Sequence, residues 1–246
     1  CNCGFGVDDL LPGAYPPENV VLDLLVREVA QRLQSSAPPI SCPSGAVFYR
    51  IVNAQGNSNA ERAFKSLVDE RILRGTALII LSEDSTGLEG EIYARLRRRK
   101  FRATTGTDDG FDTREIPYCP NCILVPVEEV DALTVASWKR VFLHEARHLI
   151  QLRRNPDLAR DFRSSGRFTT YAAFCEACAD DGLYTTPVYH ARERMAALRV
   201  AIGEKNELLL ARACQGDREA YQELVRLYEA QNEGGGAFAD LFPPYY

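Results

Sequence analysis

The sequence lacks several features that would place it in a large class of proteins at once. It has no apolar run of 18 residues, which argues against a transmembrane segment, and it contains no internal repeat or low-complexity tract. Its formal net charge of -5 gives no overall basic surface for nucleic acid. The one basic run, Arg95–Lys100, is more typical of a solvated helix face. With 46% hydrophobic and 26% charged residues, we expect a folded, water-soluble protein.

The 246 residues are enough for one large domain, whose first part has a mixed α/β pattern. Residues 1–17 are irregular. The elements expected after them are helices over 18–34, 60–74 and 89–100, strands over 46–53, 77–81 and 122–127, and a loop over 104–112. Pro126 lies within the last strand and favours an edge position, because proline cannot donate a hydrogen bond in the middle of a sheet.

The second part of the chain has an almost wholly helical pattern. Asp131 can cap a helix over 132–154, which the Asn155-Pro156 pair ends. Further helices are expected over 169–182, 188–214 and 218–232. We therefore predict a mixed region over 1–130, forming a small sheet and a cleft wall, and a helical region over 131–246. The two would form one continuous domain.

Histidine is scarce, since the chain has three, and two of them fall in His144-Glu145-Ala146-Arg147-His148. Residues four apart lie on one face of a helix, so His144 and His148 can present two imidazole nitrogens to one metal ion. Two ordinary solvated histidines are the alternative, but apolar residues flank the motif on both sides. Glu145 can reach a zinc-bound water and act as general base, because the metal eases deprotonation near neutral pH. The motif therefore predicts a zinc-dependent hydrolase.

A catalytic zinc site needs a third protein ligand, with its fourth position left for water. Glu176 follows His148 by 28 residues on the next predicted helix. Asp180 returns to within about 40° of Glu176 around that helix, so the two carboxylates share a face. One of them can bind zinc while the other holds a ligating histidine through its second ring nitrogen.

His190 is the alternative third ligand, 42 residues after His148. The short HExxHxxGxxH spacing of three-histidine sites is absent, so we favour Glu176. Tyr184, Tyr189 and His190 are also candidates for hydrogen-bonding the oxyanion of a tetrahedral intermediate, although each alone is more typical of a structural side chain.

These residues resemble the gluzincin metallopeptidases, in which an HExxH helix precedes a helix carrying Glu-x-x-x-Asp, here Glu176 and Asp180. The strand over 122–127 is similar to the substrate-aligning edge strand of that group. The similarity covers residues 115–190, and it is closer to the compact domains of bacterial toxins and secreted cargo than to large aminopeptidases. It implies an α+β, zincin-like fold. The implied roles are zinc ligands for His144, His148 and Glu176, general base for Glu145, and partner of a ligating histidine for Asp180.

Eight cysteines are many for a reduced cytosolic enzyme of this length, and an even number permits a disulfide framework. Cys119-Pro-Asn-Cys122 and Cys175-Glu-Ala-Cys178 form two CxxC pairs, a spacing that suits a four-thiolate structural zinc site. On a helix Cys175 and Cys178 point away from Glu176, so they could face the Cys119 loop. Disulfides or a second zinc would then join the pairs, and buried thiols are the plain alternative.

The predicted function is a zinc metallopeptidase that cleaves a polypeptide with a Glu145-activated, zinc-bound water. One alternative is a non-catalytic scaffold with structural zinc or disulfides at the CxxC pairs, and another is a zinc hydrolase with a different substrate. The cysteines favour a secreted, periplasmic or surface location, with the cytoplasm left open. A chain that starts at Cys1 fits a lipid-anchored lipoprotein or, equally, a shortened sequence.

Overall fold

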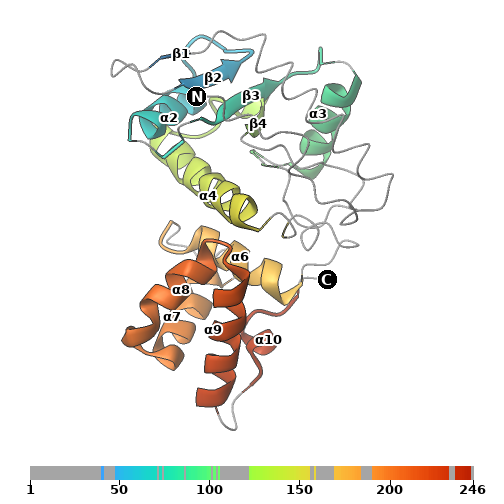
Figure 1. The fold of residues 1–246 in the computed structure, drawn as a ribbon. Helices are drawn as coiled ribbons and strands as arrows, with labels where there is room; N and C mark the ends of the chain where they lie inside the picture. The colour runs from blue at the N-terminus through green and yellow to red at the C-terminus, as the bar shows by residue number, and fades with distance from the viewer. Residues whose placement is uncertain are drawn as a thin grey trace, which may run out of the picture.

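The computed structural model of the chain describes residues 40–41, 48–70, 72–73, 75–85, 87–100, 102–103, 105, 122–155, 158, 169–183, 190–232 and 236–244. Within these residues the fold is mixed α/β, as the sequence predicts. A small sheet and its helices form one part, and a cluster of helices forms the other (Figure 1). The helix expected over 18–34 lies outside the described residues, as does most of the expected loop over 104–112.

The sheet has four strands in the order β1-β2-β3-β4. They are β1 (Ile40–Ser41), β2 (Phe48–Val52), β3 (Ala77–Leu81) and β4 (Cys122–Pro126). β1 pairs antiparallel with β2, whereas β2, β3 and β4 are mutually parallel. β4 is last in this order, with Pro126 in register with Leu81. The edge position expected for this strand is therefore confirmed among the described residues.

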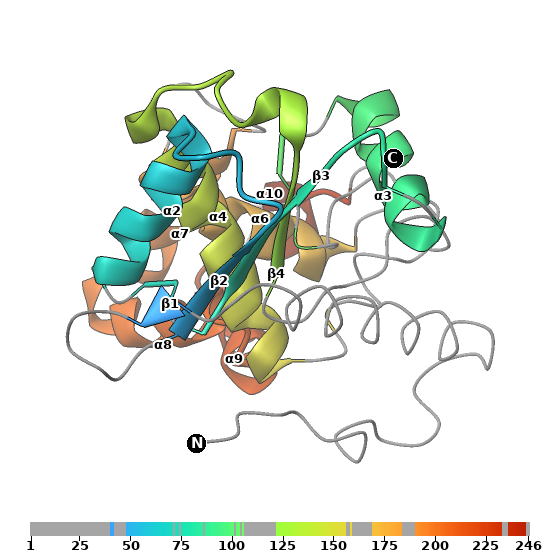
Figure 2. The ribbon, with the colours of Figure 1, turned by 90° about the horizontal axis from the view of Figure 1, so that it is seen from above.

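Helices α2 (Asn59–Asp69) and α3 (Gly87–Arg99) lie on opposite faces of the sheet (Figure 2). The residues of β3 alternate between the two faces, because successive side chains of a strand point in opposite directions. Leu78 and Ile80 join the core that includes α2, while Ile79 and Leu81 join the core that includes α3. A central strand covered on both sides explains why Ala77–Leu81 is an unbroken apolar run.

The helix that carries the HExxH motif is α4 (Val135–Arg154). Its N-cap is Thr134, whose side chain accepts a hydrogen bond from the backbone of Ser137, so the expected cap at Asp131 is wrong. Asp131 instead accepts a hydrogen bond from the backbone N–H of Asn59, at the start of α2. It therefore satisfies a free donor of a neighbouring helix rather than one of its own.

The remaining helices are α6 (Thr170–Asp180), α7 (Ala191–Ile202), α8 (Glu207–Cys214), α9 (Arg218–Gln231) and α10 (Phe238–Leu241). The single helix expected over 188–214 is wrong, because Gly203 ends α7 with a φ of 75°, and the short 3-10 turn Glu204–Asn206 leads into α8. A left-handed residue of this kind is a common helix end. No helix among the described residues has the length and apolar character needed to cross a membrane.

α4 runs between the two parts of the molecule and contributes to both cores (Figure 1). In its first half, Phe142 packs in the core between the sheet and α2, with its ring centroid 5.8 Å from that of Phe64. Near its end, Leu152 joins the helical core with Phe174 of α6. The residues between these two anchors, including the HExxH motif, are thereby held between the sheet and α6.

Candidate metal centre

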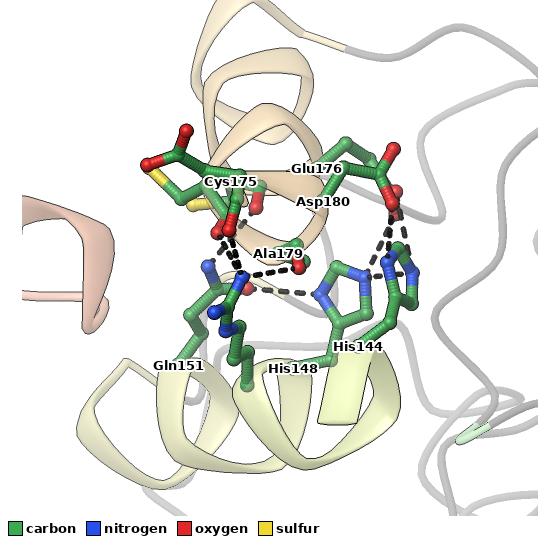
Figure 3. A network of polar contacts seen from close by, with 10 residues as sticks. His144, His148, Gln151, Cys175, Glu176, Ala179 and Asp180 are labelled. Atoms are coloured by element: carbon green, nitrogen blue, oxygen red, sulfur yellow. Dashed lines mark hydrogen bonds and ion pairs between the residues drawn. The ribbon is translucent and has the colours of Figure 1, made fainter. Parts of the chain in front are cut away.

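The two histidines of the motif lie one turn apart on the face of α4 that meets α6 (Figure 3). Their ring centroids are 4.5 Å apart, and their Nε2 atoms approach to 2.9 Å. His148 is fully buried, while the side chain of His144 is 15% exposed. The helix therefore directs two imidazole nitrogens to one point, as the spacing of four residues predicts.

Glu176 on α6 brings a carboxylate to the same point. Its Oε1 lies 3.1 Å from Nε2 of His148, and its Oε2 lies 3.6 Å from Nε2 of His144. One ligand atom from each of these three residues falls within 4.8 Å of the others. This is the one group of at least three His, Cys, Asp or Glu side chains, within the described part of the chain, with the geometry to hold a metal ion.

The outward-facing nitrogens of the two rings are already engaged. Nδ1 of His144 lies 2.8 Å from Oδ1 of Asp180, and Nδ1 of His148 lies 2.9 Å from Oε1 of Gln151. Both partners are oxygen acceptors, so Nδ1 is a protonated nitrogen in each ring. When the rings are neutral, each Nε2 presents a lone pair toward the other ring and toward Glu176.

Lone pairs and a carboxylate repel one another at these distances unless a proton or a cation lies among them. Two imidazole nitrogens and one carboxylate oxygen are a donor set that zinc accepts in catalytic sites. The residues present therefore fit a zinc ion. The engaged Nδ1 atoms match the usual arrangement, in which a metal-binding histidine donates its second N–H to a neighbouring acceptor.

Buried charge sets the protonation of the centre. Burial alone lowers the pKa of His144, but the hydrogen bond with Asp180 and the nearby carboxylates outweigh it and raise the pKa to about 10. Burial likewise opposes ionisation of Glu176, yet the charge and hydrogen bond of His148 hold the pKa of that carboxyl below its usual value. In the absence of metal, protons on the rings thus balance the negative charge.

Glu145 lies beside the centre and is only 3% exposed. Burial raises the pKa of this carboxyl, against the lowering effect of His144 and His148. The side chain of Thr105 hydrogen-bonds to it, while its Oε2 has no hydrogen-bond partner among the described residues. A buried carboxylate oxygen without a partner is costly, and a water molecule held against it would satisfy it.

Arg147, inside the same motif, holds the end of α6 in place. Its Nη1 donates to the backbone oxygens of Cys178, Ala179 and Asp181, at 3.2, 2.8 and 2.7 Å. The last carbonyl groups of a helix have no partner within it, so this contact replaces the missing hydrogen bonds. The residue thereby secures the turn that carries Asp180 against α4.

The structure does not bring every candidate residue to the centre. His190 lies outside the group, with its side chain 66% exposed and its Nδ1 2.9 Å from Oε2 of Glu193 on its own helix. It therefore pairs with Glu193 in the first turn of α7 and is not one of the three residues that converge at the centre. Tyr184 and Tyr189, the other oxyanion candidates, lie outside the described residues.

The cysteine pairs do not join in the expected way. Cys178 forms a disulfide with Cys214 of α8, a partner that the CxxC spacing does not reveal. Cys122 is buried in the core between the sheet and α3, whereas Cys175 is buried in the helical core. The expected cross-link from Cys178 to the other pair is therefore wrong. Cys119 lies outside the described residues.

Three further residues of the centre were not predicted from the sequence: Gln151, Arg147 and Thr105. Gln151 and Arg147 follow the histidines by three residues each, so helical spacing places them near the rings. That spacing was a signal for both positions. Thr105 is 40 residues before Glu145, and no local pattern links the two.

Comparison with known proteins gives no assignment: no protein-family model, no curated protein and no solved structure matches this chain.

Proposed function

We propose that this chain is a zinc-dependent metallopeptidase of the gluzincin type, with a zincin-like arrangement of sheet, HExxH helix and glutamate helix. The observation that carries the proposal is the convergence of two Nε2 atoms and the Glu176 carboxylate at one point, next to the buried carboxylate of Glu145. His144, His148 and Glu176 would hold the zinc. A bound zinc supplies positive charge that acidifies water and polarises a carbonyl group.

The residues around the ligands have separate tasks in this proposal. Glu145 accepts a proton from the attacking water and passes it to the leaving amine, which is the role of a general base and then of a general acid. Its buried Oε2, which has no hydrogen-bond partner in the described part of the chain, supports this role, because that oxygen can hold a water. Asp180 keeps the ring of His144 oriented through the contact at Nδ1.

A polypeptide is the substrate class that the sheet favours. β4 is the last strand of the described sheet and leads through a short connection into α4. An extended peptide can add to such an edge by backbone hydrogen bonds, which recognise the main chain whatever its side chains. The disulfide between Cys178 and Cys214 supports an oxidising compartment, such as the periplasm or the outside of a cell.

Zinc content and peptide cleavage together test the proposal. We would measure zinc by elemental analysis in the wild type, in the His144→Ala/His148→Ala variant and in His190→Ala. The last is a matched control, because His190 is exposed and lies outside the group. We expect one zinc ion per chain in the wild type and in the control, and none in the double variant.

Glu145→Gln separates metal binding from chemistry in a second step. The variant should keep its zinc and lose cleavage of an unfolded protein substrate by about 10²–10⁴-fold, since the amide cannot accept the proton. Full cleavage by Glu145→Gln would refute the mechanism. Equal zinc in the wild type and in His144→Ala/His148→Ala would assign the metal to other residues.

The alternative of a non-catalytic scaffold makes a different prediction from the same samples. In a scaffold the zinc would stay with the double histidine variant, because it would be held by cysteine thiolates. The disulfide removes Cys178 from any thiolate site in this structure. That observation favours the enzyme over a scaffold built on four thiolates.

A further inference from the structure

Gln151 lies one turn beyond the second histidine of the motif and is fully buried. Its Oε1 is 2.9 Å from Nδ1 of His148. Its Nε2 donates to the backbone oxygen of Cys175 on α6 at 3.0 Å (Figure 3). It also donates to the backbone oxygen of Cys214 on α8 at 2.9 Å. One amide side chain thus contacts three helices and uses both its acceptor and its donors.

The two carbonyl contacts determine which way the amide of Gln151 points. If the amide were turned over, its oxygen would face the carbonyl oxygens of Cys175 and Cys214, and all three are acceptors. The NH₂ group must therefore face those carbonyls, and Oε1 must face His148. Because an oxygen acceptor faces Nδ1, this ring nitrogen carries a proton, and in the neutral ring Nε2 is left with its lone pair.

We propose that Gln151 is a positioning residue that holds His148 in the Nδ1–H form and so directs Nε2 to the metal. The inference rests on the proposed metal-dependent function and deepens it. Gln151 does not touch the ligand position itself; it acts through the ring of His148. The metal centre then has one histidine oriented by a carboxylate, Asp180, and one oriented by a neutral amide.

The backbone around Gln151 shows that its place is fixed by the fold. The turn between α8 and α9 contains Gly216, which has a φ of 92°. A Cβ atom at this glycine would lie 2.5 Å from the carbonyl oxygen of Gln151. The turn therefore packs directly on the backbone of α4, which keeps the Cys214 carbonyl within reach of the amide.

Two substitutions separate orientation of the ring from tethering of the helices. Gln151→Met has a similar volume but loses both the acceptor and the donors. Gln151→Glu keeps an oxygen acceptor for Nδ1 of His148 and loses donors to the two carbonyls. Gln222→Met is a matched control, because Gln222 is exposed on α9.

The first measurement is the affinity of each purified protein for Co²⁺, followed by visible absorption in competition with a chelator. We expect Gln151→Met to bind Co²⁺ about 10–100-fold more weakly than the wild type, which is the usual effect of losing such a partner. Gln151→Glu should bind more tightly than Gln151→Met although its metal-free form is no more stable to urea. Gln222→Met should match the wild type.

The second measurement is made on the wild type alone, so it does not depend on the variants folding. Long-range proton–nitrogen NMR correlations on the zinc-loaded protein identify the protonated nitrogen of each of the three histidines. We expect a proton on Nδ1 of His148. A metal-bound Nδ1 would overturn the inference. Equal Co²⁺ affinity in Gln151→Met and the wild type would also overturn it. So would a loss of Co²⁺ affinity that simply follows the loss of unfolding free energy in both Gln151 variants.

These outcomes are distinct from a failure of the proposed function. If the wild type binds no metal at His144 and His148, the proposed function is wrong and the inference falls with it. If the wild type binds metal there but the Gln151 variants bind equally well, only the role of Gln151 is wrong.

Discussion

The Nδ1 atom of His144 lies 2.8 Å from Oδ1 of Asp180, across 36 residues of sequence. Asp180 follows Glu176 by one turn of α6, and Glu176 faces the Nε2 atoms of both histidines. One helix therefore supplies a carboxylate to each side of the His144 ring. Any shift of α6 along α4 would change both contacts together.

Replacing Asp180 tests its contact with Nδ1 of His144. Asp180→Ala leaves the buried Nδ1–H of His144 without an acceptor, so we expect the zinc affinity to fall about 10–100-fold. Asp180→Asn keeps an oxygen acceptor without charge and should lie between that variant and the wild type. The measurement is a competition titration with a coloured chelator.

The neighbouring residue provides the control for this experiment. Asp181 pairs through its side chain with Arg199, 2.5 Å away, and not with the histidines. Asp181→Asn should therefore leave the zinc affinity unchanged. Equal affinities in Asp180→Ala and Asp181→Asn would show that the contact at Nδ1 does not matter for metal binding.

Arg147 should matter for stability as well as for the metal. Arg147→Met removes three hydrogen bonds from a half-buried guanidinium to the end of α6. We expect the metal-free protein to lose about 1–3 kcal/mol of unfolding free energy, measured by urea denaturation. Arg140→Met, at an exposed position of the same helix, is the control and should change little. A stability loss shared equally by both variants would point to a general effect of charge.

Sequence patterns predicted the elements that rest on local spacing. β3 is a continuous apolar run, and a fully buried strand is what such a run indicates. The spacing of four residues correctly placed His144 and His148 on one face of α4. Glu176 and Asp180 likewise share a face toward that helix, because their spacing is also four.

Local spacing could not predict the contacts between distant segments. Thr134 and Asp131 are both good N-cap residues, and only the path of the chain decides that Asp131 accepts from the backbone N–H of Asn59 in α2 instead. The disulfide of Cys178 depends on how α8 folds back on α6, which CxxC spacing does not encode. In the sequence Gln151 is an ordinary polar residue of a helix. Its role depends on hydrogen bonds to backbone carbonyls of two other helices, which the sequence does not show.

The start of α9 gives a pH prediction that is independent of the metal centre. Hydrogen bonds from the backbone of Ala220 and from Arg212 hold the pKa of Asp217 below its ordinary value of 3.8. A carboxyl with a lowered pKa contributes stability above its unfolded pKa and loses it as the pH falls through the folded pKa. The contribution of Asp217 should therefore be complete at neutral pH and fade below pH 3.8.

Asp217→Asn isolates this effect, because asparagine also caps helices but does not titrate in this range. We expect the difference in unfolding free energy between the wild type and Asp217→Asn to shrink as the pH falls from 5 to 2. Urea denaturation at each pH measures it. A difference that stays constant over this range would show that the charge of Asp217 adds nothing to the cap.

The disulfide between Cys178 and Cys214 should stabilise both the helical core and the metal centre. It closes a loop with a sequence separation of 36, for which the chain-entropy model gives about 4 kcal/mol at 25 °C. Cys178→Ala/Cys214→Ala should lower the unfolding free energy by about this amount, measured by denaturation without reductant. Because Cys178 lies between Glu176 and Asp180 on α6, zinc affinity should fall as well.

Reduction of the wild type is the matched experiment, since it breaks the same bond without changing the side-chain atoms of the core. A phosphine reductant should lower the stability of the wild type toward that of Cys178→Ala/Cys214→Ala and leave the double variant unchanged. An equal effect on both proteins would trace the loss to other cysteines of the chain. If reduction weakens zinc binding only in the wild type, the disulfide helps to hold α6, and with it the glutamate ligand, against the two histidines of α4.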